Sequence, residues 1–226
     1  MLVFLTILQL LTNPYTYPVL PQKGQTISDF IPKGYHILYE YKGHLNEDTL
    51  IDITAILESD REIPDLKEEG HAQKPRILFV VFANAKGGYT LSVQSNESVL
   101  LSDDGGVFGD PLQELYIQNK CVCVDYYGGS AYKWAYTYKW RFQQNDWFLI
   151  GATHTSMSPH DNILEKYDFN LNTGKAEHTI MPWLEEEEGS PKIRPKTRRL
   201  NPGKKPLFKL KNFVFGQNMV FPDLYF

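Results

Sequence analysis

The segment 43–52 (GHLNEDTLID) holds residue types whose spacing could bind a metal ion. Asn46, Asp48 and Asp52 match three ligand positions of the calcium-loop pattern D-x-N-x-D-G-x-x-D. Oxygen side chains at such positions of a tight loop can converge on Ca²⁺. His44 stands at the first ligand position, and the glycine of the sharp turn is missing. The pattern therefore predicts a weak calcium site. The alternative is a turn whose Asn and Asp side chains bond to their own backbone.

The segment 102–111 (SDDGGVFGDP) is a second candidate for a binding loop. It combines three glycines with the carboxylates of Asp103, Asp104 and Asp110, which could form a cation or ligand site where a backbone comes close. Ser130 lies in another Gly-rich turn, which a sheet could bring to the same edge. The alternative is a wide loop that needs glycine for its positive φ angles. The glycine spacing does not match a phosphate-binding loop.

Residues suited to catalysis do not form a recognisable motif. Ser130 lacks the G-x-S-x-G context of a nucleophile elbow, and the adjacent Asp103 and Asp104 would diverge on a strand. None of the histidines is spaced i, i+4 for a helical zinc site. We therefore predict no catalytic residue. The histidines are His36, His44, His71, His154, His160 and His178.

The two cysteines, Cys121 and Cys123, are two residues apart in a strand-like segment. Their side chains should point to the same face, roughly parallel, which makes a disulfide between them strained. We expect two buried thiols that pack as small apolar groups. A disulfide-dense scaffold is excluded.

The elements that would position these loops are strands. Apolar residues recur with a period of two from residue 35 onwards, between short turns, and no segment shows a sustained helical stripe. The continuously apolar run 76–83 is typical of a central strand buried on both faces. The pattern predicts an all-β (or β-rich α+β) fold, an antiparallel meander sheet or sandwich. Strands are expected at 35–41, 50–57, 76–83, 89–93, 115–117, 121–127, 132–142 and 147–151.

An alternating aromatic row marks the strand 132–142. Such a row could stack on sugar rings, but large aromatic side chains more often fill a core, so we expect it to pack against a second layer. The row consists of Tyr132, Trp134, Tyr136, Tyr138, Trp140 and Phe142.

The chain of 226 residues begins with twelve almost wholly apolar residues, MLVFLTILQLLT. This length fits a secretory signal better than a membrane span, and the alternative is an element packed on the domain. We expect a signal peptide within 1–19, a β-rich domain over 20–183 and an extension over 184–226. The protein would then be periplasmic or secreted, with no transmembrane segment in its mature form.

Charge is unevenly distributed along the chain. Residues 1–184 carry 14 basic and 22 acidic side chains, whereas 192–211 carry nine basic and no acidic ones. Three prolines interrupt the latter stretch and Pro191 directly precedes it, so we expect a poorly structured, solvated C-terminal extension. The net charge of −4 and the lack of interleaved aromatics argue against a nucleic-acid partner.

Several segments together resemble a group of uncharacterised exported bacterial proteins. The group has a D-F-x-P-K-G-Y start, seen here as DFIPKGY at 29–35, and a G-D-L-N-x-D-G-x-x-D loop similar to FG-GAP or dockerin-type calcium loops, matched by 43–52. The segments 132–142 and 146–151 add to the likeness, which spans roughly 29–175. The resemblance implies an exported β-rich domain with a partly lost calcium loop, and it implies no established activity.

These observations favour a non-catalytic exported or periplasmic binding module with a protein or glycan partner. Two other classes stay open: a metal-assisted hydrolase that uses the Asp/Gly loops, and an immunity-type protein that binds a toxin. No cofactor other than the weakly predicted Ca²⁺ is expected. The sequence does not set the oligomeric state.

Overall fold

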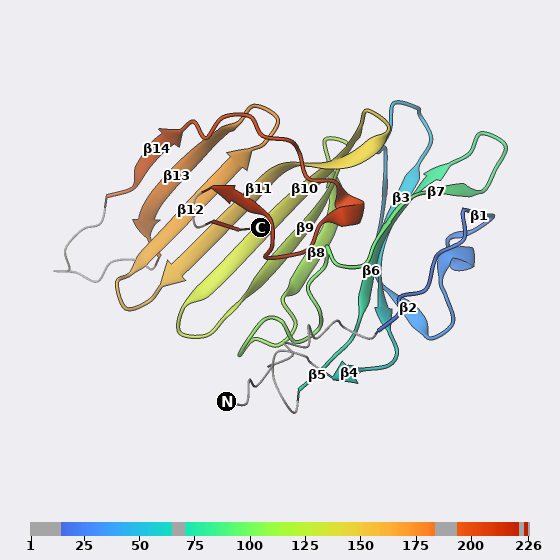
Figure 1. The fold of residues 1–226 in the computed structure, drawn as a ribbon, viewed down its shortest axis with the longest axis horizontal. Helices are drawn as coiled ribbons and strands as arrows, with labels where there is room; N and C mark the ends of the chain where they lie inside the picture. The colour runs from blue at the N-terminus through green and yellow to red at the C-terminus, as the bar shows by residue number, and fades with distance from the viewer. Residues whose placement is uncertain (1–14, 65–70, 184–193, 222–223, 226) are drawn as a thin grey trace, which may run out of the picture.

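The structure is a computed structural model that describes residues 15–64, 71–183, 194–221 and 224–225. Its regular secondary structure is almost entirely antiparallel strands, as Figure 1 shows, and this confirms the predicted all-β class. Two short 3₁₀ helices, η1 (Ile27–Phe30) and η2 (Leu210–Asn212), interrupt the connections. No helix among the described residues is long and apolar enough to cross a membrane.

Five strands form a small sheet in the order β1-β7-β6-β3-β2. All eight residues of β3 are buried, and so are the first six of β6, as expected of central strands that are covered on both faces. A two-stranded hairpin, β4 (Ile63–Pro64) with β5 (Ala72–Gln73), projects between β3 and β6. The strands of the small sheet are β1 (Lys23–Gly24), β2 (Tyr35–Gly43), β3 (Asp52–Ser59), β6 (Arg76–Ala83) and β7 (Tyr89–Ser95).

Seven strands form a large sheet in the order β14-β13-β12-β11-β10-β9-β8. Each strand pairs with its neighbour in the chain, so the predicted antiparallel meander is confirmed here. A hairpin of β15 (Met219–Phe221) and β16 (Leu224–Tyr225) ends the chain. The strands of the large sheet are β8 (Leu112–Gln118), β9 (Cys121–Gly129), β10 (Lys133–Gln143), β11 (Asp146–Ser158), β12 (Ile163–Asn170), β13 (Lys175–Pro182) and β14 (Lys196–Leu200).

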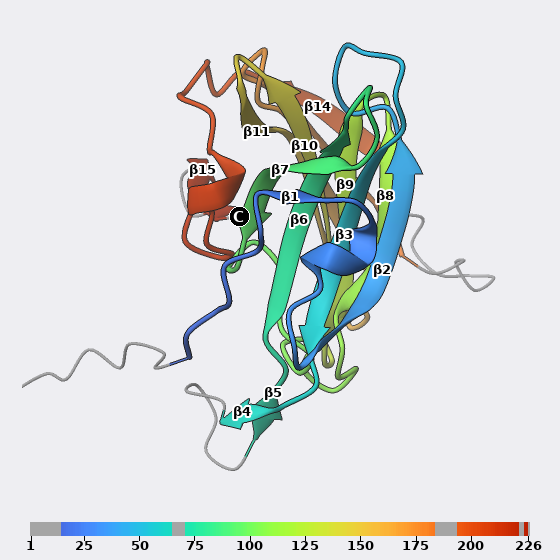
Figure 2. The ribbon, with the colours of Figure 1, turned by 90° about the vertical axis from the view of Figure 1, so that its right-hand side faces the viewer.

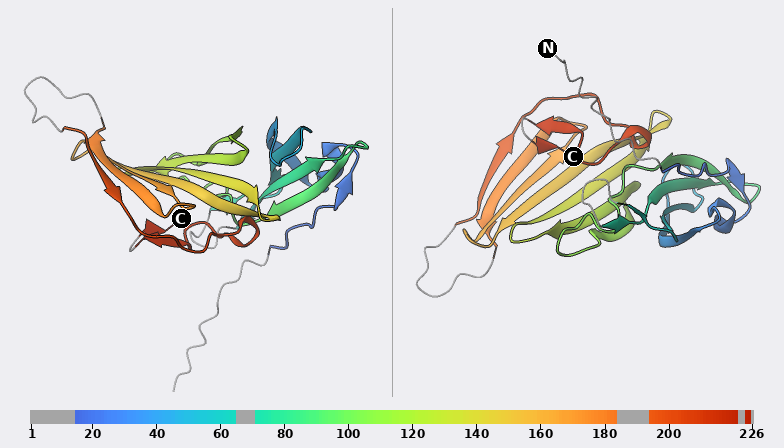
Figure 3. Two further views of the ribbon diagram at one scale, coloured as in Figure 1. Left: turned by 90° about the horizontal axis from the view of Figure 1, so that it is seen from above. Right: turned by 60° about the horizontal axis from the view of Figure 1, so that its bottom comes forward.

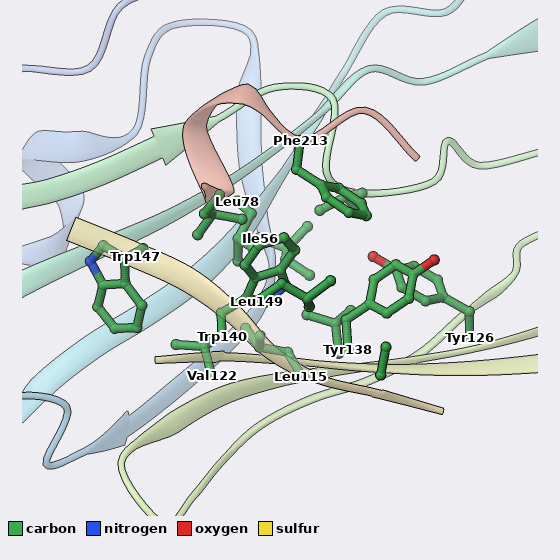
Figure 4. Packing of buried hydrophobic residues seen from close by; sticks show 14 of the residues in the cluster. Ile56, Leu78, Leu115, Val122, Tyr126, Tyr138, Trp140, Trp147, Leu149 and Phe213 are labelled. Atoms are coloured by element: carbon green, nitrogen blue, oxygen red, sulfur yellow. The ribbon is translucent and has the colours of Figure 1, made fainter. Parts of the chain in front are cut away.

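The two sheets pack face to face over part of the large sheet and enclose the main core. Ile56 and Leu78 of the small sheet belong to the same buried cluster as Val122, Tyr138 and Trp140 of the large sheet, as Figure 4 shows. Burying side chains of this size stabilises the fold by roughly 1.5–3 kcal/mol each. Tyr138 and Trp140 of the aromatic row therefore enter the core, as predicted, whereas Tyr132 precedes β10 and is 65% exposed.

The opposite face of the small sheet is covered by the N-terminal segment 15–34 (Figure 2). The Oδ2 atom of Asp29 accepts the backbone N–H groups of Gln25 and Thr26, at 2.7 and 2.9 Å, and this fixes the turn before η1. Phe30 is fully buried against Phe79 of β6. The DFIPKGY motif thus serves to attach this segment to the sheet. Of the predicted signal segment 1–19, residues 1–14 lie outside the described residues.

The described part of the predicted C-terminal extension is packed onto the domain. Lys196–Leu200 forms β14, the edge strand of the large sheet, and the chain then runs along one face of that sheet (Figure 3). Leu210 and Phe213 are buried in the main core. The basic side chains of β14 are exposed, so this stretch keeps its charges in water while its apolar residues fill the core. The segment 184–193 lies outside the described residues.

Candidate functional site

Asp52, one of the predicted calcium ligands, has a buried carboxylate that joins the loop 43–52 to β6. Its Oδ2 atom accepts the N–H of Leu45 at 3.0 Å, and its Oδ1 atom accepts the N–H of Ala83 at 3.0 Å. Burial raises the pKa of Asp52 above its ordinary value, although the N–H donors favour the carboxylate. In this position Asp52 fastens the loop to the sheet.

The other two predicted ligands bond within the loop. Asn46 Oδ1 accepts the N–H of Asp48 at 2.8 Å, and Asp48 Oδ1 accepts the N–H of Leu50 at 2.8 Å. These are the local side-chain-to-backbone bonds of the alternative interpretation. Among the described residues, no three His, Cys, Asp or Glu side chains gather into a metal-binding group. The calcium site stays a prediction.

The second candidate loop, 102–111, does lie beside the turn 128–130. The N–H of Gly129 donates to the carbonyl of Gly105 at 2.9 Å, and the N–H of Val107 donates to the carbonyl of Gly129 at 3.1 Å. A Cβ atom on Gly106 would lie 2.7 Å from the Gly129 oxygen, so glycine is needed for this close approach. The structure therefore brings together the two turns that the sequence singled out.

The carboxylates of this loop bond to the protein. Asp103 pairs with His71 of the β4–β5 region at 2.9 Å, and Asp104 accepts the N–H of Leu101 at 2.8 Å. Asp110 pairs with Arg76 at the start of β6. The hypothesis that these carboxylates meet at a ligand site is not tested by these contacts, but each of them holds the loop in place.

Arg76 is the centre of this attachment. Its side chain is fully buried, and its Nη1 atom donates to Asp110 Oδ1 at 2.8 Å and to the carbonyl of Leu100 at 3.1 Å. On the other side, Nε and Nη2 both donate to Glu58 Oε2, at 3.0 and 2.6 Å. An unpaired charge in the protein interior would be strongly destabilising, and the two carboxylates of Asp110 and Glu58 compensate the buried charge of Arg76. The loop is thereby fixed to the central strands of the small sheet.

The outer end of the loop presents apolar side chains to solvent. Val107 and Phe108 are 74% and 45% exposed. The Phe108 ring contacts that of Tyr127, with centroids 5.1 Å apart, and the ammonium of Lys133 lies 6.0 Å from the Phe108 ring and 4.8 Å from that of Trp183. We call the surface formed by Val107, Phe108, Tyr127, Lys133 and Trp183 the apolar tip.

Sequence reasoning missed Val107 and Phe108 because it weighed the polar members of their loop. The sequence does contain a signal for them: Val107 and Phe108 are adjacent apolar residues in a loop that otherwise consists of glycines, polar residues and a proline. Such a loop is expected at the surface, where apolar side chains stay exposed. Ser130, the remaining predicted site residue, is exposed, and its N–H closes the turn by donating to the carbonyl of Tyr132 at 2.8 Å.

Two histidines lie in cross-strand stacks on the inward face of the large sheet. His154 of β11 stacks on Tyr136 of β10 with centroids 4.7 Å apart, and burial lowers the pKa of His154. His178 of β13 stacks on Tyr167 of β12 at 4.3 Å, and its Nε2 lies 2.6 Å from a carboxylate oxygen of Glu165. His154 and His178 are separated by the intervening strand β12, so they do not form a pair.

We compared the chain with protein-family models, with curated proteins and with solved structures, and none of the three comparisons found a match. The resemblance to exported proteins with calcium-type loops therefore stays a prediction.

Proposed function

We propose that this protein is a non-catalytic, exported binding module that recognises another protein through the apolar tip. The observation that carries the proposal is the exposure of Val107 and Phe108 on a loop whose backbone is fixed from both sides. Exposed apolar groups that adjoin one another mark interaction sites more often than isolated ones do. The tip supplies both an aliphatic and an aromatic anchor.

The rigidity of the loop favours binding. The backbone bonds to Gly129 and the ion pair of Asp110 with the buried Arg76 hold the loop before any partner arrives. Association then costs less conformational entropy than it would if the loop had to become ordered. Apolar and aromatic side chains on such a fixed support resemble the anchors that dominate binding energy at protein interfaces.

The arrangement of the rings favours a protein over a glycan. The Phe108 and Tyr127 rings are inclined at 59° to each other, so they form no flat platform for a sugar. Lys133 lies over one face of both Phe108 and Trp183. We therefore expect the partner to bring an apolar patch for Val107 and Phe108, and an acidic or carbonyl group for the Lys133 ammonium.

The absence of catalysis is part of the proposal. It is supported by the roles of two carboxylates in the loop that carries the tip, because Asp103 holds the loop through a hydrogen-bonded contact with His71 and Asp110 holds it through an ion pair with Arg76. Export is supported by the apolar residues 1–12. Mass spectrometry of the native protein tests it: a mature chain that begins after residue 12 agrees with export, and an intact Met1 contradicts it.

A capture experiment with matched variants tests the proposed partner. Full-length protein, the double variant Val107→Ser/Phe108→Ser and the control Tyr41→Ser/Ile51→Ser serve as baits for cell-envelope proteins. Tyr41 and Ile51 are 43% and 47% exposed and lie outside the apolar tip, so the control also removes one aromatic and one aliphatic side chain from the surface. We expect a protein retained by the wild type and the control and lost with the double variant, with affinity reduced about tenfold or more. Equal retention by all three baits contradicts the proposal.

A further inference from the structure

A hollow of about 520 Å³ lies apart from the apolar tip, between the two ends of the described chain. Its walls come from the N-terminal segment at Tyr15 and Tyr17, the β4–β5 hairpin, the connection after β7 and the C-terminal segment at Phe215. Its size is within the range of small-molecule sites, roughly 300–1,000 Å³.

Three of the residues that line the hollow, Tyr15, Tyr17 and Phe215, are aromatic and are held in place by the fold. Tyr15 and Tyr17 pack edge to face with centroids 5.0 Å apart, and the hydroxyl of Tyr15 is hydrogen-bonded to that of Tyr35 at 2.6 Å. Phe215 packs against Tyr126 at 5.5 Å, and its N–H donates to the carbonyl of Glu97 at 3.1 Å. The N-terminal and C-terminal walls are therefore both tied to the sheets.

The hollow carries negative charge. Glu97 and Asp104 are among its lining residues, and none of the described residues that line it is Lys, Arg or His. Burial raises the pKa of Tyr17 to about 12, and the nearby Tyr15, Glu97 and Asp104 add to the rise. The phenol of Tyr17 accordingly stays neutral at physiological pH, while the two carboxylates give the hollow a negative potential.

Glu97 is the carboxylate best placed to meet a ligand. Its side chain is exposed and makes no hydrogen bond or ion pair with the described part of the chain, although its backbone carbonyl holds Phe215. Asp104, by contrast, caps the N–H of Leu101 and accepts a bond from Gln73 at 3.3 Å. Glu97 can therefore turn towards a positive group without loss of an existing bond.

We infer that this hollow binds a small organic cation, an ammonium group on an apolar body. The face of an aromatic ring together with a carboxylate attracts such a cation, and the apolar body would lie against Phe215 and Val214. A hard metal ion fits less well, because it needs several converging oxygen ligands, and no three His, Cys, Asp or Glu side chains of the described chain gather into a metal-binding group. An anion would be repelled by Glu97 and Asp104. The inference is independent of the proposed protein partner.

Binding of phenethylammonium, with its neutral analogue 2-phenylethanol as the matched probe, tests this inference by isothermal titration or NMR. We expect saturable binding of phenethylammonium to the full chain, and binding about tenfold weaker for 2-phenylethanol because it lacks the charge. Glu97→Gln should weaken phenethylammonium binding by a similar factor. Glu177→Gln, which removes an exposed carboxylate on β13 outside the hollow, should leave it unchanged.

Two further measurements keep the test decisive. The thermal melting temperature of Glu97→Gln shows that the variant is folded, and Tyr17→Leu removes an aromatic wall while it keeps apolar volume. Tyr17→Leu should weaken binding of the ammonium more than that of the alcohol. The inference is overturned if phenethylammonium does not saturate, if 2-phenylethanol binds equally well, or if folded Glu97→Gln binds as tightly as wild type.

Discussion

The guanidinium of Arg76 donates to both carboxylate oxygens of Asp110, so a single buried cation joins the central strand of the small sheet to the loop that carries the apolar tip. The two residues are 34 positions apart in the chain. The ion pair therefore links the stability of the core to the position of the proposed binding surface.

Removal of Arg76 should strongly destabilise the protein. In Arg76→Leu, the carboxylate of Glu58, which is 8% exposed, loses its strongest partner inside the protein. Breaking a buried pair in this way typically costs about 3–5 kcal/mol of unfolding free energy. Urea denaturation measures it. The control Lys120→Met removes an exposed partner of Glu47 and should cost less than about 1 kcal/mol. Similar losses in the two variants would show that Arg76 has no special structural role.

Gly129 should tolerate alanine far less well than Gly87. Both have positive φ angles, +115° and +90°, but a Cβ on Gly129 would lie 2.2 Å from the Tyr132 oxygen, whereas a Cβ on Gly87 meets no atom within 4 Å. Gly87→Ala should cost about 1 kcal/mol through backbone strain, and Gly129→Ala clearly more, because the turn must also move. Thermal melts of the two variants give the comparison, and a smaller loss for Gly129→Ala would contradict it.

Acidification should destabilise the protein in part through His154. Because burial lowers the folded-state pKa of His154 below its ordinary value of 6.5, the unfolded chain binds a proton at a higher pH than the folded one. The stability that depends on neutral His154 is therefore fully present above about pH 6.5 and is lost as the pH falls through the lower, folded-state pKa.

The variant His154→Phe tests this relationship, since phenylalanine can keep the stack on Tyr136 without binding a proton. Urea denaturation between pH 7.5 and 5 should show a shallower loss of stability in the variant than in wild type. Direct NMR titration of the His154 ring gives its folded-state pKa. A value at or above 6.5, or pH profiles that coincide, would rule out this role.

The two cysteines should be unreactive in the native state. Burial raises the pKa of Cys123 to about 12 and also raises that of Cys121, and both are free thiols. Because the thiolate is the reactive form, a thiol reagent at pH 8 should label neither residue in native protein and both in urea. Cys121 and Cys123 are only 4% and 0% exposed, so rapid labelling of either thiol before unfolding would contradict this burial.

The calcium prediction can be separated from the structural role of Asp48. Asp48→Ala removes the acceptor of the Leu50 N–H and should cost about 0.5–1.5 kcal/mol with or without metal. If the loop binds Ca²⁺, millimolar Ca²⁺ raises the melting temperature of wild type and does not raise that of the variant. Equal responses of both proteins to Ca²⁺ would remove the support for a site at this loop.

The sequence predicted most strands from an apolar period of two, which arises where one face is buried, and it predicted β6 from a continuous apolar run, which arises because both faces are buried. All eight expected strands are present, and β6 occupies the expected residues 76–83. It did not predict β12 and β13, whose inward positions include Glu165 and His178. Glu165 of β12 and His178 of β13 are hydrogen-bonded to each other, so they can occupy inward positions although they are polar. Their presence interrupts the alternation of apolar and polar residues by which a strand is predicted.

What the sequence alone determined was local: the alternation that sets each strand, the glycines that allow the turns, and the parallel side chains of Cys121 and Cys123. Tertiary structure decided which polar groups became internal partners and which apolar groups were left outside. Asp110 and Arg76 pair only because the loop folds back onto β6, and Phe108 is exposed because that loop ends at the rim of the sheet. Such contacts join residues that are far apart in the sequence. They depend on how the two sheets pack against each other, which cannot be predicted from a local residue pattern.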